Sequence, residues 1–375
     1  MNITEFPPEI LITIFNYLNY RDLLSVSISC YEWFNIIEQQ RYYYDYYNEK
    51  WGYPSYLMLN KYHKLDNCLD FNHHSIYSKC WKQLIIKKHR LNQFKFNLMT
   101  CKIHDDSLRT LVYCNESNML ITGSYDKSIN IYNLRTLKYV TTFYHQNMVL
   151  CLQLQNNHLF SGSLDYNIKW WDIDSKKNIH TFNQHTNAVQ SIAVNEEILY
   201  SVSYDGKIIT WDLNTVECLK NFKGHNTHIR DLALTPNNIL TCSEDQSVKI
   251  WDYSFNYVNQ LIGHKDRIHC VKSDDNLIVS GDGLGIIKFW DLRTYKCIED
   301  IKIHNGCIRH LQLDKSTIIS GSWDNTIKIW SLSDKKIIKT FNHQKSVLCF
   351  QMDDEKMFSG DLHGTLYHWY WGFSK

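Results

Sequence analysis

A histidine, a hydroxyl and an aspartate, residue types found in many catalytic and metal sites, recur in this chain before an aromatic ring. The rings follow one another at intervals of 39 or 40 residues and are Tyr132, Trp171, Trp211, Trp251, Trp290, Trp330 and Trp369. A histidine precedes six of them by 26 residues and Tyr132 by 28, namely His104, His145, His185, His225, His264, His304 and His343. A hydroxyl precedes each ring by ten residues, at Thr122, Ser161, Ser201, Thr241, Ser280, Ser320 and Ser359. Five repeats place an aspartate six residues before the ring: Asp126, Asp165, Asp205, Asp245 and Asp324.

Such sets could bind a metal ion or activate a nucleophile, but either site needs side chains that converge on one point. Here each set recurs once per repeat, which distributes the side chains along an array. The sequence also has no Cys-x-x-Cys pair, no phosphate-binding loop and no paired carboxylates outside predicted turns. We therefore expect no enzyme activity, no metal site and no cofactor.

The elements that carry these residues are predicted to be short strands. A period of about 40 residues with Gly-His and Trp-Asp markers is typical of propeller blades with four strands each. Apolar runs such as Ile286–Trp290, bounded by turn signals, agree with strands. The chain resembles the WD-repeat family over residues 94–375, most clearly at Gly224-His225…Trp251-Asp252 and Gly263-His264…Trp290-Asp291. The expected fold of this region is a seven-bladed β-propeller.

The resemblance implies a structural role for the repeated residues. In WD repeats the histidine, hydroxyl, indole and turn aspartate form a hydrogen-bonded chain inside each blade, which satisfies buried polar groups. Tyr132 replaces the indole in the first repeat, and Leu284 and His363 replace the aspartate in the fifth and seventh. We expect incomplete, locally weaker networks there. Three cysteines at one repeat-equivalent strand position should be small buried apolar side chains: Cys151, Cys270 and Cys349.

The two ends of the repeat region should close the ring. The seventh repeat finishes its third strand at residues 366–371 and has no fourth strand after it. Residues 94–103 can supply that strand. Closure of this kind removes exposed sheet edges.

Residues 1–51 lack the repeat and are predicted to be a small all-α module. A proline pair suits a helix start, and apolar residues then recur at helical spacing. The series Phe6-Pro7-Pro8…Ile14-Phe15…Asp22-Leu23…Cys30…Trp33 resembles an F-box, which binds a Skp-family adaptor. Phe6 and Ser29 depart from the family's leucine and valine, which lowers the expected docking strength. The alternative is a helical cap on the propeller. The implied adaptor-binding residues are Phe6, Pro7, Pro8, Ile10, Leu11, Phe15, Leu18, Asp22 and Leu23.

Residues 52–93 are predicted to be a helical linker. Gly52 and Pro54 end the preceding helix, and apolar residues from Trp81 to Leu91 follow at near-helical spacing. This stretch resembles the linker of F-box/WD-repeat proteins. Its five basic residues are interpreted as a solvated helix face, in preference to a nucleic-acid or membrane site.

One mouth of the ring is the candidate substrate face. In a WD propeller the residues five positions after each repeat histidine lie there: Arg109, Leu150, Gln190, Arg230, His269, Arg309 and Leu348. Similar F-box/WD proteins bind phosphorylated degrons with arginines at such positions, since guanidinium groups suit phosphate. Ordinary surface charge with internal ion pairs is the alternative, and Glu244 could neutralise an arginine. The implied substrate-binding residues are Arg109, Arg230, Arg267, His269, Arg309, Trp323, Tyr125 and Tyr204, with repeats four to six forming a cluster.

Composition restricts the partners. The chain has 40 Lys and Arg against 39 Asp and Glu. We therefore expect no overall positive electrostatic field that would attract nucleic acid or membranes. It shows no charged leader before an apolar core and no run of 18 apolar residues, which favours an intracellular protein of the cytoplasm, the nucleus or both.

The resemblance implies the substrate-recognition subunit of an SCF-type (cullin-RING) ubiquitin ligase. The F-box would bind a Skp-family adaptor and through it a cullin. The propeller would hold a protein substrate, phosphorylated or not. The alternative is a WD-repeat scaffold of another multiprotein complex.

Overall fold

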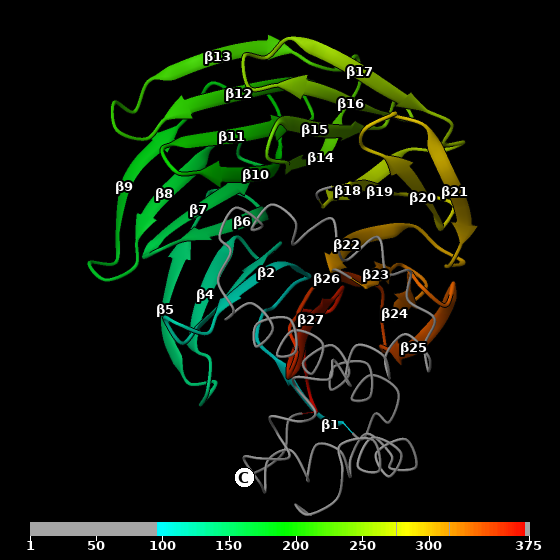
Figure 1. Ribbon diagram of the computed structural model, residues 1–375. Helices are drawn as coiled ribbons and strands as arrows, with labels where there is room; N and C mark the ends of the chain where they lie inside the picture. Colours follow the sequence, from blue (N-terminus) through cyan, green and yellow to red (C-terminus); the bar gives the residue numbers. More distant parts are fainter. Residues whose placement is uncertain (1–95, 275, 315, 372–375) are drawn as a thin grey trace, which may run out of the picture. The chain divides into compact units, whose positions relative to one another are not determined.

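The strands of the repeat region form seven four-stranded sheets, which are the blades of a propeller (Figure 1). The computed structural model describes residues 96–371 except 275 and 315. All regular elements within these residues are β-strands. The predicted mainly β class and the seven-bladed propeller are confirmed.

Blades one to six take their strands in sequence order from the innermost to the outermost, whereas the outermost strand of blade seven is β1. Blade one contains β2 (Leu108–Cys114), β3 (Met119–Ser124), β4 (Ser128–Asn133) and β5 (Tyr139–Tyr144). Blade two contains β6 (Val149–Gln155), β7 (His158–Ser163), β8 (Ile168–Asp172) and β9 (Lys177–Phe182). Blade three contains β10 (Val189–Asn195), β11 (Ile198–Ser203), β12 (Lys207–Asp212) and β13 (Cys218–Lys223).

The remaining blades follow the same plan. Blade four contains β14 (Ile229–Leu234), β15 (Asn238–Ser243), β16 (Ser247–Asp252) and β17 (Tyr257–Ile262). Blade five contains β18 (Ile268–Ser273), β19 (Leu277–Asp282), β20 (Ile286–Asp291) and β21 (Cys297–Lys302). Blade six contains β22 (Ile308–Asp314), β23 (Thr317–Ser322), β24 (Thr326–Ser331) and β25 (Lys336–Asn342). Blade seven contains β26 (Val347–Met352), β27 (Lys356–Asp361), β28 (Thr365–Tyr370) and β1 (Asn97–Lys102).

Strand β1 closes the ring, as predicted. It pairs antiparallel with β28 from Asn97 opposite Tyr370 to Lys102 opposite Thr365. Beside this ladder, the ring of Phe96 lies 5.2 Å from that of Trp369. Each innermost strand contacts the innermost strand of the next blade, and β26 contacts β2. The blades therefore form a closed circle.

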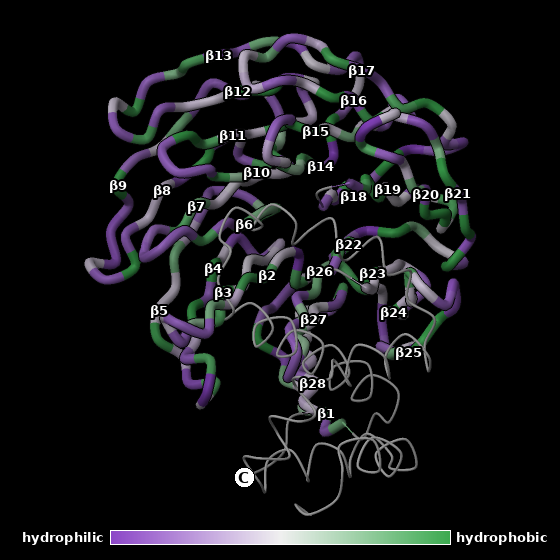
Figure 2. Tube along the Cα trace, in the orientation of Figure 1, coloured by the Kyte–Doolittle hydropathy of each residue, from purple (hydrophilic) through white to green (hydrophobic). Residues whose placement is uncertain are grey.

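The core lies between the blades. The second strand of each blade is buried almost throughout, whereas the outermost strands are largely exposed. Burial on both faces explains the continuous apolar runs of the second strands. Hydrophobic and hydrophilic colours are mixed along the outermost strands (Figure 2). Neighbouring blades also share aromatic contacts, since Trp171 of blade two stacks on Phe143 of blade one at 4.7 Å.

The predicted hydrogen-bonded chain is present inside the blades. In blade two, His145 Nε2 lies 2.7 Å from Ser161 Oγ, and His145 Nδ1 lies 2.9 Å from Asp165. The indole of Trp171 donates to the same Ser161 hydroxyl at 2.8 Å. Blades three and four repeat all three bonds.

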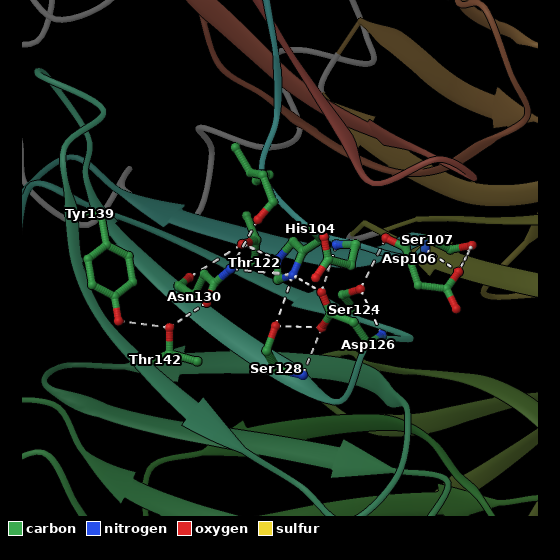
Figure 3. A network of polar contacts seen from close by, with 12 residues as sticks. His104, Asp106, Ser107, Thr122, Ser124, Asp126, Ser128, Asn130, Tyr139 and Thr142 are labelled. Carbon is green, nitrogen blue, oxygen red and sulfur yellow. Dashed lines mark hydrogen bonds and ion pairs between the residues drawn. The ribbon is translucent and has the colours of Figure 1, made fainter.

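The network of blade one is incomplete, as expected from its tyrosine. His104 bonds Thr122 and Asp126 at 2.8 and 2.9 Å, and Ser128 joins the same network (Figure 3). The Tyr132 hydroxyl donates to the Ile103 carbonyl, 3.4 Å away, and not to Thr122. The link between ring and hydroxyl is therefore missing in this blade.

The prediction of incomplete networks in the fifth and seventh repeats is wrong for blade five and confirmed for blade seven. His264 Nδ1 bonds Asp282 at 2.9 Å, so the network of blade five is complete without an aspartate at Leu284. The equivalent Asp361 of blade seven accepts instead from the Tyr367 hydroxyl at 3.0 Å. His343 Nδ1 consequently has no hydrogen-bond partner in the described part of the chain.

Cys151, Cys270 and Cys349 are buried in inner strands, as predicted. The adaptor-binding residues, the small all-α F-box at 1–51 and the helical linker at 52–93 lie outside the described residues.

Candidate functional site

Each innermost strand begins with a β-bulge, and its extra residue lies five positions after the repeat histidine. In blade one the pairing with β3 shifts between Leu108 and Thr110, which leaves Arg109 as the extra residue. The other six blades show the same shift. A bulge interrupts the alternation of a strand and redirects one side chain. The bulge residues, called the mouth residues below, are Arg109, Leu150, Gln190, Arg230, His269, Arg309 and Leu348.

Glu244 holds together the polar side chains of blades three to five. Its carboxylate forms an ion pair with Arg230, whose Nε donates to it at 2.7 Å. It also lies 3.4 Å from His228 Nδ1 and 4.0 Å from Arg267 Nε. The Tyr204 hydroxyl accepts a hydrogen bond from Arg230, and the Tyr204 ring stacks on His228. The positive charge of Arg230 is therefore balanced within the protein.

Arg309, His269 and Trp323 form a second group on blades five and six. Arg309 Nη1 donates to His269 Nδ1 at 3.1 Å, and the guanidinium carbon lies 5.9 Å from the Trp323 ring. Burial, followed by repulsion from Arg309 and three other arginines, lowers the pKa of His269 to about 2. His269 is consequently neutral near pH 7, and its Nδ1 accepts a hydrogen bond from Arg309. Half of the Trp323 surface is exposed, so this group reaches the solvent.

Arg109 belongs to neither group. It is the mouth residue of blade one and is buried, and its Nε has no hydrogen-bond partner. Tyr125 lies at the β3–β4 turn of the same blade, where its backbone N–H donates to the Ser107 carbonyl at 3.0 Å. Among the described residues, neither Arg109 nor Tyr125 forms a hydrogen bond with Glu244 or with the side chains around it.

The structure thus divides the predicted substrate face into parts. Arg230, Arg267 and Tyr204 surround Glu244, whereas His269 and Trp323 accompany Arg309. Sequence reasoning identified Glu244 as able to neutralise an arginine but missed the bulges, because pairing registers leave no local signal. A role of these residues in substrate binding stays a prediction.

The described residues offer no other candidate centre. They contain no group of three or more His, Cys, Asp or Glu side chains that could hold a metal ion. No helix among them is long and apolar enough to span a membrane.

Comparisons with known proteins agree with the geometry. The F-box-like family model matches residues 3–49. The WD domain, G-beta repeat model matches residues 96–133, 137–172, 176–212, 216–252 and 255–291. The TEP-1 C-terminal beta-propeller model matches residues 304–371.

Among solved structures, the crystal structure of the computationally designed Ika8 protein is similar, with a TM-score of 0.61 and 24% identity. The match covers 71% of this chain and 97% of that one, and at this identity it shows the fold alone. Because an F-box-like sequence precedes WD repeats that fold as a seven-bladed propeller, the chain is an F-box/WD-repeat protein.

Proposed function

We propose that this protein is the substrate-recognition subunit of an SCF-type ubiquitin ligase. The observation that carries the proposal is the combination, in one chain, of an F-box-like sequence at residues 3–49 with a WD-repeat propeller. Proteins of this architecture are typically adaptors that catalyse nothing themselves. The F-box would bind a Skp-family adaptor and through it a cullin, in the cytoplasm or the nucleus.

The mechanism would be positioning. A substrate held on the propeller meets the ubiquitin-loaded enzyme at a high effective concentration, and this proximity takes the place of chemistry by the receptor. The substrate side of the proposal is supported by the mouth residues and by Trp323, whose half-exposed ring lies beside the Arg309 guanidinium. Aromatic and arginine side chains often dominate protein interfaces. A phosphorylated substrate would suit the excess of guanidinium groups there.

Affinity purification of the full chain tests the adaptor step. The wild type should capture a Skp-family adaptor together with a cullin. Leu11→Ala combined with Phe15→Ala should abolish capture, since truncating an apolar interface anchor commonly costs about 2 kcal/mol. Circular dichroism must show that the variant stays folded. Undiminished capture by a folded double variant would refute the F-box assignment.

A matched propeller variant separates the two halves of the function. Arg309→Ala should release the substrate while adaptor capture persists, and phosphatase treatment shows whether the substrate must be phosphorylated. The alternative scaffold function would be favoured if the wild type purified reproducibly with other proteins and with neither adaptor nor cullin.

A further inference from the structure

Each blade presents its outermost strand as a sheet edge, and most of these edges carry charged side chains. An unpaired edge can pair with a strand of another chain, and charged side chains on the edge discourage this. Strands β1, β9, β13, β21 and β25 each contain at least one Lys, Glu or Asp. Strands β5 and β17 contain none. These two edges therefore lack the usual protection.

Strand β17 combines this lack of charge with exposed apolar surface. It is the last strand of the blade-four sheet, and no other described strand pairs with its outer side (Figure 1). Val258 is 39% exposed and Ile262 is 73% exposed, the highest value among the large apolar side chains of the described residues. The sequence has no Asp, Glu, Lys or Arg between Asp252 and Lys265. An uncharged, apolar edge of this kind can accept a further strand.

The regular part of β17 comprises residues 259–262. Val258 is the extra residue of a bulge in the pairing with β16. Strands β5, β9, β13 and β21 have a bulge at the equivalent place. The bulge is thus common to these outer strands and does not distinguish β17 from them.

A two-fold axis through Gln260, perpendicular to the sheet, makes β17 complementary to itself. Antiparallel pairing about this axis places Gln260 opposite Gln260, and Ile262 of each copy opposite Val258 of the other. Apolar side chains then meet apolar side chains, and no like charges face each other. Gln260 bonds Asn259 through its backbone N–H, and its side-chain amide has no hydrogen-bond partner among the described residues. Two such amides can donate to each other across the axis.

Strand β5 suits such pairing less well, although it also lacks charge. Thr142 occupies the position of Gln260 in the pairing with the third strand of its blade. Its hydroxyl donates to Asn130 at 2.6 Å and lies 3.0 Å from the Tyr139 hydroxyl (Figure 3). Lys138 also precedes β5 directly. The central side chain of β5 is therefore already engaged within its own blade.

We propose that β17 pairs antiparallel with β17 of a second copy of this chain. The pairing would join the two blade-four sheets into one continuous sheet and cover Val258 and Ile262 of both copies. It uses neither the F-box-like sequence nor the mouth residues. The dimer would therefore stand if the proposed function failed.

Sedimentation equilibrium of the full chain over a concentration series tests the dimer. The mass of the wild type should rise from that of one chain towards that of two. Ile262→Lys should raise the dissociation constant more than about tenfold, because the edge would then carry a charge against an apolar side chain of the other copy. Tyr144→Lys is the matched control, since both positions are exposed and lie opposite a serine of the third strand. This variant should keep the dimer, and circular dichroism checks that both variants fold.

Oxidative cross-linking tests the pairing register. Gln260→Cys would place two thiols opposite each other, where the Cα atoms of an antiparallel pair lie about 4.5–5.5 Å apart and a disulfide can form. Oxidation should therefore give more covalent dimer with Gln260→Cys than with the wild type, whose Cys101 and Cys297 are exposed. Asn259→Cys, opposite Leu261 in this register, should not exceed the wild type.

A dimer that Ile262→Lys weakens and Tyr144→Lys retains, with cross-linking specific to Gln260→Cys, supports the proposal. The mass of one chain at every concentration would overturn it. So would a dimer that Ile262→Lys leaves unchanged, an equal loss in Tyr144→Lys, or equal cross-linking of the two cysteine variants.

Discussion

His343 shows how a buried histidine responds when its usual carboxylate is engaged elsewhere. Its Nε2 lies 2.8 Å from Ser359, but Asp361 accepts from Tyr367, whose ring lies 4.4 Å from the histidine ring. Burial lowers the pKa of His343 to about 4, although the charge of Asp361 opposes this effect. His343 is therefore neutral in the folded protein near pH 7.

This shift predicts a pH-dependent loss of stability. Between the ordinary histidine pKa of 6.5 and the folded value of about 4, the unfolded chain binds more protons than the folded one. The free energy of unfolding should therefore be fully retained above pH 6.5 and fall below it, by up to about 1.4 kcal/mol per pH unit for this residue. Urea unfolding of His343→Gln should show a shallower fall in this window than the wild type. His363→Gln, at an exposed position of the same blade, is the control and should follow the wild type.

The networks also show where residue-by-residue reading of the repeats succeeds. The spacing of histidine, hydroxyl and aromatic ring predicted the bonds of blades two to four. It failed in blade five because a second position can supply the carboxylate: Asp282 occupies the place that is serine in five other blades. Asp361 has the same sequence position in blade seven, but its carboxylate accepts a hydrogen bond from the Tyr367 hydroxyl and not from His343. The signal was present in the sequence, but the choice between partners depends on side-chain geometry.

At the scale of elements, the turn after the second strand of each blade contains a residue in the left-handed backbone conformation. The residue that follows the turn aspartate, or its replacement, has a positive φ in every blade, from 66° to 83°. In this left-handed region a side chain costs about 1 kcal/mol, whereas glycine and asparagine are tolerated. The seven residues are Lys127, Tyr166, Gly206, Gln246, Gly285, Asn325 and Gly364.

Two substitutions at this turn should differ in their effect on stability. Gly285→Ala should destabilise the protein by about 1–3 kcal/mol, because the new Cβ would lie 2.2 Å from the His304 carbonyl oxygen and the φ is 83°. Tyr166→Asn should be neutral or stabilising by up to about 1 kcal/mol, since the tyrosine is half exposed at a φ of 71°. Chemical denaturation of both variants checks this. A loss of stability in Tyr166→Asn as large as in Gly285→Ala would show that packing, and not φ, dominates the turn.

Strands could be predicted from the sequence, whereas the bulges could not. Apolar runs and turn residues follow from local preferences, so the blade strands and hairpins appeared at the expected places. A bulge is a property of the pairing between two strands, and Arg109 or Arg309 has no local feature that announces it. The spacing from the repeat histidine and the resemblance to WD repeats selected the same seven residues, but the bulges that redirect their side chains were available only from the structure.

At the scale of the whole molecule, side chains tie neighbouring blades together. Gln312 of blade six donates to the Met352 carbonyl at 2.6 Å and accepts from its N–H at 2.9 Å. Gln351 of blade seven bonds Tyr113 of blade one in the same reciprocal way. These bonds join residues about 40 or 240 positions apart. The period of the sequence predicted the ring, but charge pairing across blades, as at Glu244, depends on contacts that the period does not reveal.

Ring closure by β1 leads to the last prediction. Strand β28 pairs with β27 on one side and β1 on the other, so removing β1 would expose the backbone groups of β28 from Thr365 to Tyr370. It would also remove the contacts of Phe96 with Trp369 and Phe341. A chain that starts at residue 96 should therefore unfold at a clearly higher temperature than one that starts at residue 103. The shorter chain should also aggregate more readily, because an unpaired strand edge templates pairing with other chains. Differential scanning fluorimetry together with light scattering measures both effects. Equal melting and equal scattering of the two chains would show that blade seven does not depend on its fourth strand.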